Sequence, residues 1–121
     1  MMKKILFLMQ FLIIILFNQI CFAYKEPPQV VLQRFDLPGT PYHNCGMSMV
    51  TFLPGDIKSR HEHTGPEVGF VLEGELILKL EGHPAKTIHA GESFQIPMHV
   101  FHTTEAGPEG AKVIATWILK K

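Results

Sequence analysis

The fold of this chain is decided by a stretch that reads Gly55-Asp56-Ile57-Lys58-Ser59-Arg60-His61-Glu62-His63-Thr64-Gly65-Pro66-Glu67 and continues from Val68 to Gly74. One residue separates the two histidines, so on an extended segment both imidazoles point to the same face. The turn before Glu67 can bring its carboxylate back toward the rings. Imidazole and carboxylate are ligands for zinc, iron, manganese, nickel and copper. The spacing therefore favours a metal site over a solvated polar loop.

The same stretch resembles the first sequence motif of the cupin family, G-x5-H-x-H-x3-E-x6-G. It matches at every defining position, which are Gly55, His61, His63, Glu67 and Gly74. The family's second motif resembles the segment from Gly91 to Ala106, with matches at Gly91, Pro97 and His102. His99 stands where the family usually has glycine, and Ala106 where it often has asparagine. Neither position is normally a metal ligand, so these departures concern the turn and the polarity of the pocket.

The resemblance implies that one divalent ion, Fe(II), Mn(II) or Zn(II), is bound inside a β-barrel by His61, His63, Glu67 and His102. Three neutral imidazoles and one carboxylate would leave such a site with a net charge of +1 and room for water or substrate, which suits Lewis-acid work or oxygen activation. The resemblance also implies a metal-dependent enzyme of the dioxygenase or lyase/isomerase type that acts on a small organic molecule. A non-catalytic module that binds or senses a metal or small ligand, and a barrel with a vestigial site, remain alternatives.

Short apolar runs separated by glycine and proline turns predict an all-β domain of seven or eight strands, without a helical period after the first thirty residues. We expect strands at 29–35, 46–53, 67–73, 76–80, 85–89, 93–96, 100–104 and 111–119. The pair 67–73 and 76–80 is interpreted as a hairpin, and 105–110 as a loop. The second strand is apolar on both faces, which predicts that both are buried. These strands agree with the jelly-roll barrel or sandwich that the resemblance implies.

The predicted pocket follows from strand parity. If Glu67 faces the metal, Gly69 and Val71 line the same cavity, and the missing side chain of Gly69 makes room for a ligand. The other candidate pocket residues are Met49, Thr51, Phe94 and Trp117. A largely apolar wall predicts a small apolar or aromatic ligand rather than a sugar phosphate. His99 is a candidate acid/base at the pocket mouth, against the alternative of a turn residue without function.

Residues 1–23 have the pattern of a secretory signal peptide, with a basic start, an apolar run from Ile5 to Phe17 and cleavage after Ala23. The apolar run is short for a membrane-spanning helix, which needs about 20 residues. A retained anchor and lipid attachment at Cys21 are the alternatives. The chain is thus divided into the signal peptide, an N-terminal extended segment at 24–34 and a cupin β-barrel domain at 35–121. This organisation predicts a periplasmic or secreted protein, with no membrane association after cleavage.

Cleavage would remove two lysines from a chain with eleven basic and eleven acidic side chains, and the mild acidic excess argues against a nucleic-acid partner. It would also leave Cys45 as a single cysteine, which we interpret as a core residue rather than a reactive thiol beside His43. A domain this small buries a limited core. We therefore expect a homodimer in which a partner covers one face of the sheet.

Overall fold

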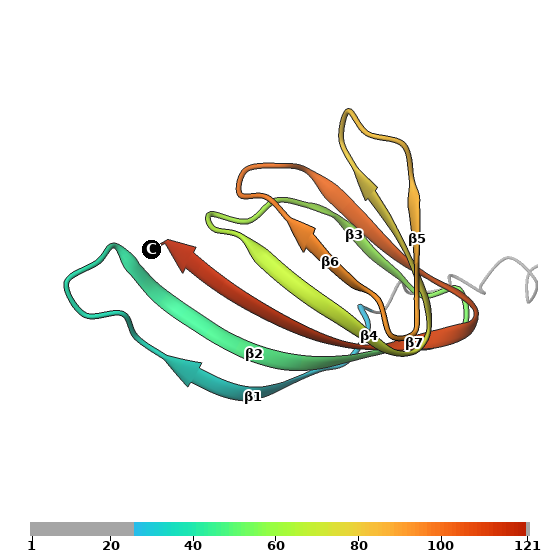
Figure 1. Ribbon diagram of the computed structural model, residues 1–121, viewed down its shortest axis with the longest axis horizontal. Coiled ribbons are helices and arrows are strands. Elements are labelled where there is room, and N and C mark those ends of the chain that lie inside the picture. Colours follow the sequence, from blue (N-terminus) through green and yellow to red (C-terminus); the bar gives the residue numbers. More distant parts are fainter. Residues whose placement is uncertain (1–25, 121) are drawn as a thin grey trace, which may run out of the picture.

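The structure is a computed structural model that describes residues 26–120, and within this range the chain forms antiparallel strands (Figure 1). The strands are β1 (Gln29–Phe35), β2 (Tyr42–Phe52), β3 (Ile57–His61), β4 (Glu67–Leu80), β5 (Lys86–His89), β6 (Ser93–Ile96) and β7 (His102–Lys120). The prediction of an all-β fold is confirmed. No helix in the described range has the length and apolar character needed to cross a membrane. The predicted signal peptide and Cys21 lie outside the described residues.

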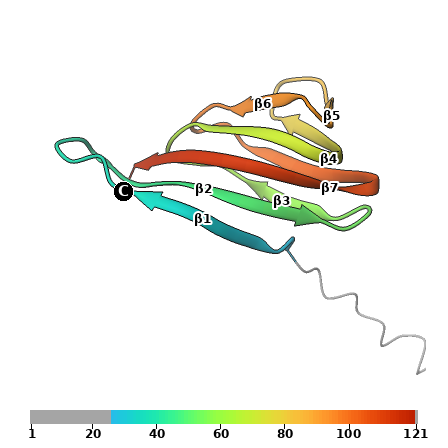
Figure 2. The ribbon, with the colours of Figure 1, turned by 60° about the horizontal axis from the view of Figure 1, so that its bottom comes forward.

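Two long strands, β4 and β7, hold the fold together because each pairs with different neighbours along its length. The C-terminal half of β7 pairs with β2 and with the first half of β4. The N-terminal half of β7 pairs with β3 and with the second half of β4, which also pairs with β5. Figures 1 and 2 show the result, a strongly curved sheet that folds back over its concave side.

The predicted hairpin between residues 67–73 and 76–80 is wrong, because both segments belong to the single strand β4. Gly74 lies between them with a φ of 71°, and a Cβ atom there would overlap the carbonyl of Gly110. The glycine therefore bends the strand against β7 without reversing it. The predicted loop at 105–110 is likewise a part of β7.

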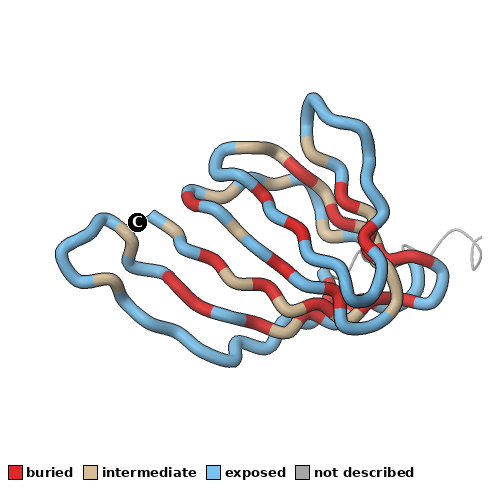
Figure 3. Tube along the Cα trace, in the orientation of Figure 1, coloured by how far each residue is buried: buried red, intermediate tan, exposed pale blue. Residues whose placement is uncertain are grey.

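The hydrophobic core lies on the inner face of the curved sheet, where buried and exposed residues alternate along the strands (Figure 3). Its members are Val50, Phe52, Val71, Leu76, Leu78, Ile88, Phe94, Ile96, Ala106, Ala111 and Val113. Glu67, Gly69 and Val71 share this inner face, as their parity predicts. Burying each large aliphatic side chain contributes about 1.5–3 kcal/mol, so the core stabilises the bend at which the two halves of β4 meet.

Between Gly46 and Phe52, strand β2 is buried on one face only, so the prediction of burial on both faces is wrong there for the single chain. Ser48, Val50 and Phe52 point inward and are buried. Thr51 is exposed and Met49 is half-buried on the opposite face. Successive side chains of a strand point to opposite faces, so Met49 and Thr51 do not line the inner cavity.

The N-terminal extended segment is partly strand β1, whose seven residues are all exposed although the strand pairs with β2. The structured domain therefore includes residues before the predicted start of the barrel at 35. Cys45 pairs with Phe35 across these strands and is 1% exposed, as expected of a core cysteine.

His99 is the only residue other than glycine with a positive φ, 59°, in the described part of the chain. It occupies the position at which the resembling motif has glycine. Its backbone amide donates a hydrogen bond to the carbonyl of His63, at 2.9 Å. The left-handed conformation thus ties the turn before β7 to the segment that follows β3.

We expect His99→Val to destabilise the domain relative to His99→Gly by about 1–2 kcal/mol, because a β-branched residue is strained in the left-handed region. Urea unfolding of both variants measures the difference. His83→Val, in an exposed turn without a positive φ, is the matched control and should change stability little. Equal stability of the two His99 variants would contradict the prediction.

Candidate metal centre

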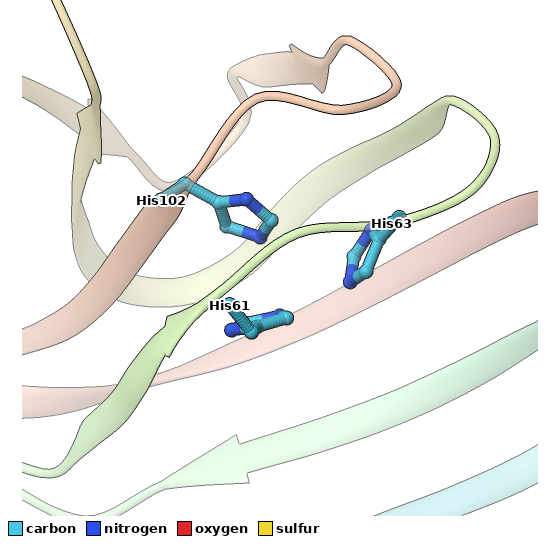
Figure 4. Close-up of side chains that lie close together, drawn as sticks. All are labelled: His61, His63 and His102. Carbon is cyan, nitrogen blue, oxygen red and sulfur yellow. The ribbon is translucent and has the colours of Figure 1, made fainter.

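Three histidines from separate parts of the chain converge on one point, as Figure 4 shows. His61 ends β3, His102 begins β7, and the two residues face each other in the antiparallel pair β3–β7. His63 follows in the loop between β3 and β4. The ring centroids are 4.2 Å apart for His61 and His102, 4.8 Å for His61 and His63, and 4.9 Å for His63 and His102. One nitrogen of each ring lies within 4.8 Å of the others.

Backbone carbonyls fix the protonation of two of these rings. His61 Nδ1 lies 2.6 Å from the carbonyl oxygen of Ser59, and His102 Nδ1 lies 2.9 Å from that of Val100. A carbonyl only accepts, so Nδ1 carries the proton in both contacts. In this tautomer the lone pair of each ring lies on Nε2, as in metal-binding histidines whose other nitrogen is held by a carbonyl.

His63 and Glu67 lie next to each other at one side of the site and are both partly desolvated. His63 Nδ1 lies 3.4 Å from Glu67 Oε2, and both side chains are 15% exposed. Burial lowers the pKa of His63 to about 4, helped by the charges of His102, His61 and Lys58. Burial also raises the pKa of Glu67, although Lys58 opposes this shift. At neutral pH His63 is therefore an unprotonated imidazole and a competent ligand.

The donor set fits a divalent transition metal. His63 Nδ1 is buried without a hydrogen-bond partner, which would cost about 1–3 kcal/mol if nothing compensated it. Burial is also the main cause that lowers the pKa of His102, so this ring is a neutral imidazole at neutral pH as well. Three histidines can therefore hold a metal ion, whose identity stays open. Glu67 is not one of these three but contacts His63, so its predicted role as fourth ligand stays a prediction.

His99, the predicted acid/base, lies on the surface rather than in the site. Its side chain is 61% exposed, and its Nδ1 lies 4.0 Å from the carboxylate of Glu62. What connects it to the metal centre is the backbone hydrogen bond to His63. The geometry therefore supports a positioning contribution from the His99 backbone and gives its imidazole no place beside the three rings.

A cavity of about 340 Å³ adjoins the histidine cluster. It is lined by Gln29, Val31, Arg34, Asn44, Lys58, His63, Glu67, Trp117 and Leu119. Trp117 is the one predicted pocket residue that lines it. Val71 and Phe94 belong to the hydrophobic core, and a Cβ atom at Gly69 would overlap the ring of Phe94. The space beside Gly69 is thus filled by Phe94 and is not available to a ligand.

The predicted apolar wall is wrong for this cavity, because four long polar side chains contribute to it. Arg34 comes from β1 and Lys58 from β3, while Gln29 and Asn44 supply amide groups. Strict alternation along β1 would place Arg34 on the outer face, and no sequence pattern predicted the position of Lys58. The register shifts between Val31 and Gln33, before Arg34, and between Lys58 and His61, after Lys58.

The fold and the site together define a small antiparallel β-barrel protein whose interior histidines can hold a metal ion. A family model described as "Cupin domain" matches residues 48–118. The chain therefore belongs to the cupin family. This range contains all three histidines of the cluster, His61, His63 and His102.

The chain is similar to two curated proteins of different kinds. It is 33% identical over 100 residues to the HTH-type transcriptional regulator PuuR of Escherichia coli, covering 68% of this chain and 54% of that protein. It is 39% identical over 66 residues to the dimethylsulfoniopropionate lyase DddW of Ruegeria pomeroyi, covering 54% of this chain and 43% of that protein. The chain thus spans about half the length of the curated relatives it matches.

Among solved structures, an RmlC-like cupin from Shewanella frigidimarina has a TM-score of 0.64 and 22% sequence identity. The superposed region covers 85% of this chain and 90% of that one. This likeness shows the fold, and it extends over nearly the whole of the Shewanella protein.

Removing one imidazole should abolish tight metal binding. We expect His63→Ala to weaken zinc affinity by at least about tenfold, since even outer-shell substitutions at metal sites cost that much. Metal content after dialysis and a competition titration with a chromogenic chelator measure the loss. The matched control is His83→Ala, because His83 is exposed in a turn away from the cluster. A His63→Ala protein that retains one metal ion per chain with unchanged affinity would contradict the assignment.

Proposed function

We propose that this protein is a small exported cupin enzyme that uses one divalent metal ion to transform a small organic molecule. The observation that carries the proposal is the convergence of three imidazoles beside a cavity of about 340 Å³. Cavities of roughly 300–1,000 Å³ are typical of small-molecule sites. Lyase-type chemistry is the leading reaction class, with dioxygenation as the other.

The residues of the chain have separate tasks in this proposal. His61, His63 and His102 would hold the ion, with Glu67 beside His63 as the predicted fourth ligand. A bound divalent ion supplies Lewis-acid polarisation of a substrate oxygen or activation of bound water or oxygen. Trp117 and Leu119 supply apolar wall that restricts water, while the amides of Gln29 and Asn44 can orient polar groups of the substrate.

Similarity to the lyase DddW, which is 39% identical over 66 residues, supports the lyase class. The raised pKa of Glu67, caused by burial, is also useful to such a reaction. A carboxyl group whose pKa is raised toward neutrality can accept a proton and return it. Glu67 could therefore act on a proton if the three histidines suffice to hold the metal.

A non-catalytic module that binds a small ligand is the second candidate function. The specific observation in its favour is the similarity to the transcriptional regulator PuuR, which is the longer of the two curated matches. In this alternative the same cavity binds a ligand without turnover, and the metal serves as part of the binding surface.

The two candidates are separated by a turnover assay on protein loaded with Fe(II), Mn(II) or Zn(II). We expect conversion of at least one member of a panel of small organic acids that includes dimethylsulfoniopropionate, detected as product formation or oxygen uptake. Chelation of the metal and the His102→Ala substitution should each abolish turnover, while His83→Ala should not. If the protein binds stoichiometric metal but shows no turnover, the binding module is favoured. If it binds no stoichiometric metal, both candidate functions are excluded, because each includes a bound metal ion.

Export remains part of the proposal on the strength of residues 1–23 alone. The mature protein would then act in the periplasm or outside the cell. A chain in the exported fraction whose intact mass corresponds to a start at Tyr24 is the expected result, and an unprocessed N-terminus would overturn it.

A homodimer is the proposed assembly, because one face of the sheet is apolar and exposed. Val68, Phe70 and Leu72 point outward from β4 with exposures of 52%, 41% and 38%. Met47 and Ile118, on the neighbouring strands β2 and β7, are exposed by 36% and 38%. Contiguous apolar side chains on an outer face mark an interaction surface. A second copy would bury them through a two-fold contact.

We expect Phe70→Glu to convert the dimer into a monomer, because it would bury two like charges in the contact. Size-exclusion chromatography with light scattering measures the mass. Met98→Glu is the control, because Met98 is 41% exposed in the turn before β7 and does not belong to β2, β4 or β7. A monomeric wild-type protein at micromolar concentration would rule out the dimer.

A further inference from the structure

The cavity beside the histidines has a charge pattern that the proposed reaction leaves unexplained. Two cationic side chains, Arg34 and Lys58, line it from different strands. Within residues 26–120 neither has a carboxylate oxygen within 4.0 Å. By contrast, Arg60 and Lys79 on the outer surface are paired with Glu81 and Glu105. The two cavity cations are therefore available to a ligand.

A β-bulge directs Arg34 into this cavity. Gln29 and Val31 pair with Val50 and Ser48, which point inward. Strict alternation would then place Arg34 on the outer face. The register shifts between Val31 and Gln33, however, so that Arg34 pairs with Gly46 and shares the inner face. The extra residue of β1 thus turns the guanidinium toward the site.

A second bulge does the same for Lys58. On β7, Thr104 and His102 are two residues apart and both point inward. Their partners on β3, Lys58 and His61, are three residues apart, because the register shifts between them. One extra residue therefore allows the ammonium and the first metal-binding imidazole to face the same interior. The bulge in β3 thus directs both a predicted metal ligand, His61, and a cation, Lys58, to the interior.

The guanidinium is also held in place. Arg34 Nη1 donates to Asn44 Oδ1 at 3.4 Å, and Trp117 Nε1 donates to the same oxygen at 3.3 Å. A guanidinium has five N–H donors, so this contact leaves several of them for a ligand. Gly46 permits the arrangement, because a Cβ atom there would contact the Trp117 ring at 2.8 Å. Arg34, Asn44 and Trp117 therefore form one wall of the cavity.

We propose that this cavity binds a small organic anion, a carboxylate with an apolar body, whose charged end lies between Arg34 and Lys58. The apolar body would rest against Val31, Trp117 and Leu119, which line the same cavity. This inference deepens the proposed function. It rests on that function, because the proposed function identifies this cavity as the substrate site. It names the substrate class as an organic acid, whereas the sequence predicted a small apolar or aromatic ligand.

The test compares benzoate with benzamide, which have nearly the same size and shape but differ by one negative charge. Trp117 is the single tryptophan of the chain and lines the cavity, so its fluorescence reports binding of either probe. Zinc-loaded protein should bind benzoate at least about tenfold more tightly than benzamide, as expected for a charge-assisted hydrogen bond. Each of Arg34→Gln and Lys58→Gln should reduce this preference by at least about threefold.

Affinity for benzamide should change little in these variants, and Lys58→Arg should restore the preference for benzoate. Arg60→Gln is the matched control, since this arginine stacks on Phe101 and pairs with Glu81 outside the cavity. Circular dichroism and zinc content establish that each variant is folded and loaded. Equal affinity for the two probes, or a preference that survives both substitutions, would overturn the inference.

The same measurement on metal-free protein separates this inference from the proposed function. If the protein takes up no zinc but still prefers benzoate through Arg34 and Lys58, the anion site stands and the metal-dependent enzyme falls. If zinc binds stoichiometrically and benzoate has no advantage, the organic-acid substrate falls and the metal centre stands.

Discussion

The antiparallel pairing of β3 with β7 is the constraint on which the site depends. It places His61 directly opposite His102, although the two residues lie far apart in the sequence. The pair also needs the register shift that follows Lys58, because a slip of one residue would turn an imidazole from the interior to the solvent. A strand of only five residues, β3, thus sets both the metal centre and one wall of the cavity.

The fold could be predicted from sequence because its signals are local. Alternating apolar residues in 93–96 and the glycine and proline turns around them identify β6 with its observed bounds, and the same holds for β1. The histidine pair belongs to a motif with fixed spacing, so its convergence with His102 followed from the resemblance. What sequence could not supply was the course of β4 through Gly74, because a bent strand and a hairpin have the same pattern of residues.

The cavity was harder to predict, and the reason is geometric. A strand's inner and outer residues can be assigned by parity only up to the first bulge, after which every later assignment is reversed. Arg34 follows such a shift in β1, and in β3 the shift falls between Lys58 and His61. Met49 and Thr51 fail for a different reason, since an apolar strand gives no sign of which face meets the core. Only the tertiary pairing with β7 decides that question.

The site also shows how a small domain can combine a stable core with an electrostatically unfavourable interior. The buried Nδ1 of His63 and the buried hydroxyl of Thr104 have no hydrogen-bond partner, which weakens the folded state locally. The edges that border the cavity are nevertheless tied together, because Ser59 donates to Glu26 from both its hydroxyl, at 2.7 Å, and its amide, at 3.4 Å. These bonds join the segment before β1 to β3, and so connect the strand that carries Arg34 to the strand that carries Lys58 and His61. A ligand held between the two cations would therefore link β1 to β3, the strand that carries His61, and a bound metal would in turn favour the anion electrostatically.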